Sequence, residues 1–260
     1  MNINTVVSTS FPKKRLSQNF LTDKNIVKKI VTSSGIHAGD TVVEIGCGQG
    51  ALTEMLIEKA GRLYGIEYDA QLIPALNEKF GSRQIFKLIA EDVLEFDWRR
   101  VEAKQFKVIG NLPYHITSPI IFRIIDERDR IETLTMMIQK EVAQRIVAAP
   151  SSKVYGILSV FCQFHADCKK LFDVPPTAFF PKPKVYSSIV QMTFRPFAVA
   201  PSNYEIFRIV VRQSFNQRRK MLRNSLSELI QGKSIPFDFE RRPETLSVRE
   251  FVELSNYIAS

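Results

Sequence analysis

The sequence predicts an α/β fold in which a mixed sheet carries helices on both faces and a small helical domain follows at the C-terminus. Three observations point to it: short apolar runs alternate with helical patterns between residues 41 and 149, a glycine-rich turn follows the first of these runs, and helical, basic segments come after residue 197. Strands that alternate with helices are typical of a largely parallel sheet covered on both sides.

The elements of the sheet follow one another in a regular order. Asp23 precedes an amphipathic helix whose apolar stripe includes Ile26 and Ile30, and its carboxylate is placed to cap that helix. The runs typical of buried strands are Thr41–Ile45, Arg62–Glu67, Ile85–Ile89, Phe106–Gly110 and Thr133–Ile138. The helical patterns between and after them are Ala51–Ala60, Ala70–Phe80, Ser118–Ile125 and Lys140–Ala149.

Prolines mark where the regular alternation ends. Four of them between Val174 and Tyr186 forbid a regular helix or a central strand, so this segment is predicted to be a stiff, extended loop. Ser187–Phe194 alternates as one more strand, and a helix that begins near Tyr204 should break near Asn216. We therefore expect a sheet domain at residues 1–197, with a basic arm at 1–22, and a helical domain at 198–260.

Charge and composition limit the classes of function. The formal net charge is +9, and residues 181–260 hold 13 basic and 7 acidic side chains. A basic surface favours polyanions such as nucleic acid, although a merely solvated basic surface fits composition equally well. No run approaches the roughly 18 apolar residues of a membrane span, so we expect a cytoplasmic protein. Three cysteines without paired spacing predict neither disulfides nor a metal site, and nothing predicts more than a monomer.

A glycine-rich turn is the first candidate binding site. Residues 44–50, Glu-Ile-Gly-Cys-Gly-Gln-Gly, follow a predicted strand and open a helix, where glycines allow a cofactor to approach the backbone. Glu67 ends the second strand, where a carboxylate can accept both ribose hydroxyls, and Asp92 follows the third, where it can accept from an adenine amine. These residues predict a nucleoside cofactor, but they fit a nicotinamide enzyme as well as a methyltransferase.

The motif that decides the chemistry is Asn111-Leu112-Pro113-Tyr114, directly after the fourth strand. It resembles the motif of methyltransferases that act on amino groups of adenine, cytosine or glutamine. The lone pair of an adenine amine is delocalised into the ring, so attack on a methyl group requires acceptors for the amine hydrogens. The Asn111 side chain supplies one, and a backbone carbonyl of Leu112 or Pro113 supplies the other. The alternative is a turn that ends the strand and uses Asn and Pro for conformational reasons.

A base in such a site needs an aromatic face on each side. Tyr114 supplies one face, on which an extruded base can stack. Phe179 or Phe180, held by the prolines around them, is the candidate for the other. The competing interpretation places both phenylalanines in the core.

Taken together, the motifs resemble the ribosomal RNA adenine dimethyltransferase family over nearly the whole chain. The resemblance includes the glycine turn, the 111–114 motif, Gln18-Asn19-Phe20-Leu21, the run from Phe179 to Ser187 and the run from Phe215 to Asn224. It implies the Rossmann-like fold of class I methyltransferases and S-adenosyl-L-methionine as the cofactor. By this resemblance, the cofactor-binding residues are Asn19, Leu21, Gly46, Glu67, Asp92 and Asn111, and the residues that clamp the target base are Asn111, Leu112, Tyr114 and Phe179.

The resemblance also implies a substrate. Members of the family dimethylate two adjacent adenosines in the terminal hairpin loop of small-subunit (16S) ribosomal RNA, late in assembly of the subunit. We therefore expect the immature small subunit as partner, with contacts to RNA phosphates from two basic clusters whose alternative is a salt-bridged surface. These are Lys13, Lys14, Arg15, Arg218, Arg219, Lys220 and Arg223.

Other functions remain open on the sequence alone. One is the related resistance methyltransferase of large-subunit RNA, which the C-terminal run beginning at Gln217 disfavours. Another is an RNA-binding assembly factor whose catalysis is secondary or lost. A nicotinamide enzyme is the weakest, because it explains neither the 111–114 motif nor the basic C-terminal segment.

Overall fold

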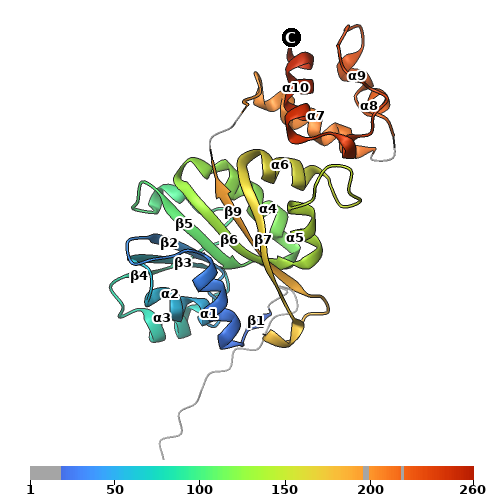
Figure 1. Ribbon diagram of the computed structural model, residues 1–260. Coiled ribbons are helices and arrows are strands. Elements are labelled where there is room, and N and C mark those ends of the chain that lie inside the picture. The colour runs from blue at the N-terminus through green and yellow to red at the C-terminus, as the bar shows by residue number, and fades with distance from the viewer. Residues whose placement is uncertain (1–18, 196–198, 218–219) are drawn as a thin grey trace, which may run out of the picture. The chain divides into compact units, whose positions relative to one another are not determined.

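The computed structural model describes residues 19–195, 199–217 and 220–260. These residues divide into two compact units (Figure 1). The sheet unit comprises residues 19–140 and 170–194, and the helical unit comprises residues 141–169 and those from 195 onward. The predicted domain boundary between 197 and 198 stays a prediction, and the helical unit also takes in residues 141–169.

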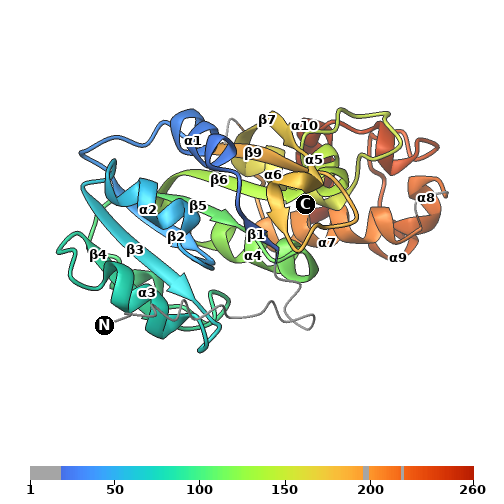
Figure 2. The same cartoon turned by 90° about the horizontal axis from the view of Figure 1, so that it is seen from below.

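A seven-stranded sheet of order β4-β3-β2-β5-β6-β9-β7 forms the framework, and Figure 2 shows the strands in this order. Strands β2 to β6 pair in parallel and β9 pairs antiparallel to β6, so the sheet is mixed. The chain order reverses between β2 and β5, where doubly wound sheets open a crevice for ligands. The strands are β2 (Thr41–Ile45), β3 (Arg62–Glu67), β4 (Phe86–Ala90), β5 (Phe106–Asn111), β6 (Ile131–Gln139), β7 (Ala166–Val174) and β9 (Ser187–Phe194).

The central strands are buried on both faces. Val42 and Val43, successive residues of β2, are both inaccessible to solvent, and so are Leu63 and Tyr64 of β3. Successive side chains of a strand point to opposite faces, so both faces of the sheet are covered. Helices α1, α2 and α3 gather beside β2, β3 and β4 in Figure 1. The helices of this unit are α1 (Lys24–Ser33), α2 (Ala51–Ile57), α3 (Ile73–Phe80) and α4 (Thr117–Asp126).

The predicted cap of α1 is confirmed. Asp23 Oδ1 accepts hydrogen bonds from the backbone N–H groups of Asn25 at 2.9 Å and Ile26 at 3.2 Å. These groups have no partner within the helix, so the cap satisfies two of the four N–H groups that every helix start leaves open. The buried face of α1 consists of Val27, Ile30 and Val31, whereas Ile26 of the predicted stripe is only half-buried.

A second, two-stranded sheet joins the N-terminal segment to the proline-rich loop. Strand β1 (Phe20–Leu21) pairs antiparallel with β8 (Phe179–Phe180), so Phe20 lies opposite Phe180 and Leu21 opposite Phe179. The loop also contains a short 3-10 helix, η5 (Pro176–Ala178), whose last carbonyl accepts the N–H of Thr22 at 2.8 Å. The prolines therefore exclude long elements, but the loop still forms local structure.

The helical unit has its own core between α6, α7 and α10. The ring centroids of Phe161 and Phe207 are 5.8 Å apart, and those of Phe215 and Phe251 are 5.7 Å apart. Helix α7 ends at Asn216, which confirms the predicted break. The helices of the helical unit are α5 (Lys140–Ile146), α6 (Ile157–His165), α7 (Tyr204–Asn216), α8 (Leu222–Ser225), α9 (Ser227–Ile230) and α10 (Val248–Ala259).

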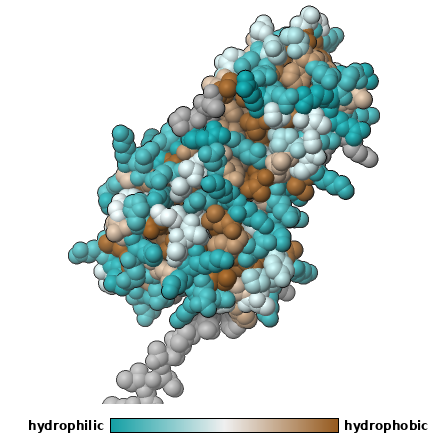
Figure 3. Space-filling model, viewed as in Figure 1, coloured by the Kyte–Doolittle hydropathy of each residue, from teal (hydrophilic) through white to brown (hydrophobic). Residues whose placement is uncertain are grey.

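In the part of the chain that the structure describes, no helix combines the length and apolarity needed to cross a bilayer. On the face shown in Figure 3 hydrophilic residues predominate and hydrophobic residues form scattered patches.

Candidate active site

A cavity of about 250 Å³ opens at the carboxyl ends of the parallel strands, beside the point where the strand order reverses. This is the edge where open α/β sheets bind ligands. Leu21 lines a smaller neighbouring cavity beside the glycine turn. The predicted site residues that line the larger cavity are Asn19, Gly46, Glu67, Asp92, Asn111, Leu112, Pro113 and Tyr114.

The glycine turn passes close to its neighbours because its glycines lack side chains. Gly46, Gly48 and Gly50 have φ angles of +74°, +56° and +80°, in the left-handed region that L side chains rarely adopt. A Cβ at Gly48 would lie 3.3 Å from the Phe20 ring, and one at Gly50 would lie 2.5 Å from the Phe80 ring. The turn thus packs under β1 and against α3 while its backbone faces the cavity.

Glu67 ties the glycine turn to the end of β3. Its Oε2 accepts the N–H of Gly48 at 2.9 Å and its Oε1 accepts the N–H of Asp69 at 2.8 Å. Burial raises the pKa of this carboxyl, and the two backbone hydrogen bonds oppose that rise. Each carboxylate oxygen has a second lone pair, so both remain able to accept a ribose hydroxyl from the cavity.

Asp92 is held in a similar way after β4. Its Oδ1 accepts the N–H of Leu94 at 2.9 Å, and its backbone carbonyl accepts the N–H of Glu95 at 3.0 Å. Among the described residues no hydrogen bond engages Oδ2. The turn therefore orients the carboxylate toward the cavity wall and keeps one oxygen for an amine donor.

Asn111, the last residue of β5, is oriented by the N-terminal segment. Its amide Nδ2 donates to the backbone carbonyl of Asn19 at 3.0 Å. With the nitrogen engaged in this way, the acceptor atom Oδ1 is the part of the amide left for a ligand. Asn19 thus orients Asn111, the residue predicted to carry the chemistry, through its main chain.

The backbone carbonyls of the motif are not equivalent. The Pro113 carbonyl accepts from Ile116 N at 3.2 Å and from Thr117 Oγ1 at 3.1 Å, which occupies both of its lone pairs. Leu112 is held to β6 by a hydrogen bond from its N–H to the Met137 carbonyl at 3.1 Å. Of the two carbonyls that the sequence left open, the geometry favours Leu112 as the second acceptor beside Asn111.

The two predicted stacking residues lie in different environments. Tyr114 lines the cavity, its hydroxyl lies 2.6 Å from Ser187 Oγ, and burial raises the pKa of the phenol. Phe179 is only 2% exposed and belongs to the apolar core of the sheet unit, whereas Phe180 is 63% exposed. Neither phenylalanine lines the cavity described above, so the stacking role of Phe179 stays a prediction.

Comparison with known proteins identifies the family. The model of the ribosomal RNA adenine dimethylase family matches residues 10–259. A relative in Francisella tularensis subsp. tularensis (strain WY96-3418), ribosomal RNA small subunit methyltransferase A, is 42% identical over 258 residues, or 95% of this chain and 97% of the relative. The chain belongs to the ribosomal RNA adenine dimethylase family. It is therefore an rRNA adenine dimethyltransferase. Methyltransferases of this kind use S-adenosylmethionine.

Solved structures confirm the predicted fold class. A dimethyladenosine transferase from Plasmodium falciparum superposes with a TM-score of 0.76 at 24% identity, covering 90% of this chain and 95% of that one. The 23S rRNA methyltransferase ErmE superposes with a TM-score of 0.73 at 22% identity, covering 93% of this chain and 100% of that one. The chain thus has the class I methyltransferase fold.

One polar residue of this dimethylase was not predicted from the sequence. Glu44 is fully buried in β2, where its Oε2 accepts from Thr53 Oγ1 at 2.7 Å and its Oε1 has no partner among the described residues. Burial, with a smaller contribution from the charge of Glu67, raises the pKa of Glu44 to about 8. The signal was present, because a carboxylate stands inside an apolar strand run beside the glycine turn, in the wall of the smaller cavity.

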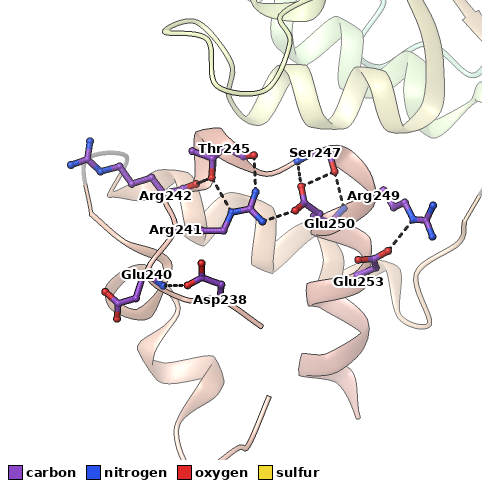
Figure 4. A network of polar contacts seen from close by, with 9 residues as sticks. All are labelled: Asp238, Glu240, Arg241, Arg242, Thr245, Ser247, Arg249, Glu250 and Glu253. Carbon is purple, nitrogen blue, oxygen red and sulfur yellow. Dashed lines mark hydrogen bonds and ion pairs between the residues drawn. The ribbon is translucent and has the colours of Figure 1, made fainter. Parts of the chain in front are cut away.

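The basic residues predicted to bind RNA are only partly described. Lys13, Lys14, Arg15, Arg218 and Arg219 lie outside the described residues. Lys220 is exposed, whereas Arg223 forms an ion pair with Glu240 at 2.6 Å. Nearby, Arg241 pairs with Glu250 and Arg249 pairs with Glu253 (Figure 4). The alternative of a salt-bridged surface therefore holds for Arg223, and the RNA-binding role of the set stays a prediction.

Proposed function

We propose that this dimethylase transfers methyl groups from S-adenosylmethionine to the exocyclic amines of two adjacent adenosines in the terminal hairpin loop of small-subunit (16S) rRNA. The substrate would be the immature small subunit late in assembly. The enzyme would act on it as a monomer in the cytoplasm. The name of the 42% identical relative supports the small subunit as target. The observation that carries the chemistry is Asn111, held by the Asn19 carbonyl at the cavity edge.

The cavity fits the cofactor by shape and by donor and acceptor chemistry. The backbone of the glycine turn borders the cavity at Gly46 and Gly48, and the carboxylates of Glu67 and Asp92 lie in the same wall. Glu67 would accept the ribose hydroxyls and Asp92 the adenine amine, while Asn19, Leu21, Gly46 and Asn111 would complete the contacts. When bound, S-adenosylmethionine supplies a methyl group on a positively charged sulfur.

The motif then prepares the adenosine amine as a nucleophile. Asn111 Oδ1 would accept one amine hydrogen and the Leu112 carbonyl the other, which turns the nitrogen lone pair away from the ring and toward the methyl group. Asn111 Nδ2 donates a hydrogen bond to the Asn19 carbonyl, and the Leu112 N–H donates one to the Met137 carbonyl. Both acceptors are therefore held in position before the substrate arrives. Acceptors that need no reorganisation contribute most to lowering a barrier.

The base itself would be held between aromatic rings. Tyr114 would stack on one face from the cavity wall, with Pro113 shaping the turn that carries it. Phe179 is assigned to the other face by its place in the family motif, although its ring is buried in this structure. Lys13, Lys14, Arg15, Arg218, Arg219 and Lys220 would contact RNA phosphates, and Arg223 would do so only when released from its ion pair with Glu240.

The test is transfer of labelled methyl groups to under-methylated small subunits, with mass mapping of the RNA and Asn111→Ala as the control. We expect dimethylation of adjacent adenosines in the terminal hairpin, lost in the control. Transfer to large-subunit RNA instead would move the target to the other subunit. Cofactor binding without transfer to either subunit would support a binding role in assembly and contradict the proposed reaction.

A further inference from the structure

The loop between β8 and β9 exposes aromatic and apolar side chains that the site does not use. We call residues 180–186, Phe-Pro-Lys-Pro-Lys-Val-Tyr, the 180–186 loop. Phe180 is 63% exposed, Tyr186 52% and Val185 41%. Exposed apolar groups clustered in one segment are a mark of a binding surface, since isolated ones need no explanation but a cluster does.

Both ends of this loop are joined to the active site. At its start, Phe180 pairs with Phe20, the residue after Asn19, whose carbonyl orients Asn111. At its end, Ser187 follows Tyr186 directly and lies within hydrogen-bonding distance of the Tyr114 hydroxyl. The loop therefore lies beside the place where the target base must enter.

Both aromatic residues of the loop lie on backbone that is paired within the sheet unit, and the Tyr186 ring has a contact of its own. The Tyr186 carbonyl accepts the N–H of Lys140 at 2.9 Å, and Lys140 Nζ lies 5.6 Å from the centroid of the Tyr186 ring. Lys140 is in turn held by Asp173 at 2.8 Å. Phe180 sits in a strand whose alternation turns Phe179 into the core and Phe180 outward. Aromatic residues on ordered backbone lose less conformational entropy when a ligand stacks on them than residues on an unpaired segment would.

The charges within the 180–186 loop have one sign. Lys182 and Lys184 are both exposed, and the sequence contains no Asp or Glu between residues 174 and 204. Aromatic faces interleaved with cations are the combination that binds single-stranded nucleic acid, because bases stack on the rings while cations meet the phosphates. A hairpin loop offers unpaired bases of this kind.

We propose that the 180–186 loop is an RNA-binding surface distinct from the base-binding cavity. It stacks the unpaired nucleotides that flank the target adenosine on Phe180 and Tyr186, and it holds their phosphates with Lys182 and Lys184. The inference rests on an rRNA substrate, and it adds a contact that positions the RNA strand rather than the reacting base.

The test of stacking uses a probe that reports on single bases. An RNA hairpin with two adjacent adenosines in its loop carries 2-aminopurine at the neighbouring nucleotide, whose fluorescence falls when it stacks. We expect quenching with the wild type and its loss with Phe180→Ala or Tyr186→Ala, each of which should weaken RNA binding roughly tenfold. Phe180→Leu and Tyr186→Leu keep apolar bulk without an aromatic face, so they should also lose quenching while keeping the fold.

The test of the lysines is the salt dependence of binding. Lys182→Gln combined with Lys184→Gln should reduce the slope of log affinity against log salt by about 1.4, since each phosphate contact with a single strand contributes about 0.7. Lys59→Gln with Lys104→Gln removes the same charge from exposed positions that precede β3 and β5, at the opposite edge of the sheet, and should leave the slope unchanged.

Two results would overturn the proposal. One is wild-type affinity and quenching in both alanine variants while their S-adenosylmethionine affinity shows that they are folded. The other is unchanged binding of the hairpin with a loss of binding only to whole subunits, which would assign the loop to a ribosomal protein. Failure of the proposed function is a separate result, because wild-type protein would then not methylate small subunits whatever the hairpin shows.

Discussion

The carboxyl edge of the sheet and the basic surface of the helical unit were both predicted to bind ligands, and the structure treats their polar groups differently. At the sheet edge Asn111 is held through Nδ2 and Asp92 through Oδ1, and each of these two side chains has a second polar atom left for a ligand. In the helical unit several charges pair with one another, as Arg223 does with Glu240. Polar groups in a binding site are held in one orientation but keep hydrogen-bonding capacity for a ligand. A count of charges in a sequence does not show which of them are already paired within the protein.

Figure 4 shows polar groups around Glu250 in the helical unit that are engaged with one another. Glu250 accepts from Arg241, from the Ser247 N–H and from the Ser247 hydroxyl, and these contacts lower the pKa of Glu250 to about 2. The same carboxylate closes the capping box at the start of α10. These residues organise the unit, and their charges are not free for RNA phosphates.

The largest expected effect breaks the orientation at the sheet edge. Asn111→Ala removes the acceptor, and Asn111→Asp keeps an acceptor but places a carboxylate oxygen against the Asn19 carbonyl. We expect kcat to fall roughly 100- to 1000-fold in both, the usual cost of losing one preorganised hydrogen bond to the reacting group. Single-turnover methyl transfer to small subunits measures it. If Asn111→Asp kept wild-type kcat, the bond to Asn19 would have no part in the reaction.

Sequence patterns predicted the strands of the sheet well where a short apolar run is also a buried segment. Strands β2 and β3 have their predicted bounds, because short apolar runs between turn residues are what buried parallel strands require. Helix α6 and strand β7 were not predicted. Residues 157–165 are apolar on nearly every face, and helix passes to strand between His165 and Ala166 with no glycine or proline to divide them.

The site was predictable only where a side chain carries the chemistry. Asn111 and Glu67 each end an apolar strand run, which marks them directly. Asn19 contributes a backbone carbonyl, which every residue type possesses, so only the resemblance pointed to it. The burial of Phe179 depends on pairing with Leu21, more than 150 positions away along the chain, and periodicity within one segment carries no information on such pairing.

The next effect concerns the stability of the glycine turn. Gly50→Ala places a Cβ 2.5 Å from the Phe80 ring at a φ of +80°, and Phe80 is itself buried against Phe86. We expect the free energy of unfolding to fall by about 3 kcal/mol, from backbone strain and overpacking together. Gly35→Ala is the matched control, with a φ of +69° and open space around the new Cβ, and should cost about 1 kcal/mol. Urea unfolding of both variants measures the difference, and equal losses would rule out the contact with Phe80.

A smaller expected effect is a pH dependence of stability that comes from Glu44, the buried carboxyl of the sheet unit. Burial raises the pKa of Glu44 to about 8 in the folded protein from its ordinary value of 4.5, so between these values only the folded state holds the proton. The free energy of unfolding contributed by this group therefore falls as pH rises through that window. From pH 6 to pH 8 the fall is about 2 kcal/mol.

Glu44→Gln should abolish this part of the pH dependence. Urea unfolding at pH 6 and pH 8 should show a smaller loss of stability in Glu44→Gln than in the wild type. Glu58→Gln, which changes an exposed carboxyl at the end of α2, should keep the wild-type dependence. An identical pH dependence in Glu44→Gln and the wild type would mean that Glu44 is ionised throughout this range.

The smallest effect sharpens the comparison within the helical unit itself. Lys220 is exposed with no ion pair among the described residues, whereas Arg223 is paired with Glu240, so the two cations should differ in their use. Lys220→Gln should weaken binding of small-subunit RNA about twofold and reduce the salt slope by about 0.7 to 0.9. Glu240→Gln should strengthen RNA binding and increase the salt slope, because it releases Arg223 from its ion pair. The free energy of unfolding should change by less than about 1 kcal/mol, since the pair is exposed. If Arg223→Gln weakened RNA binding as much as Lys220→Gln does, the ion pair would not withhold Arg223 from RNA, and the contrast between the two regions would lie in their geometry alone.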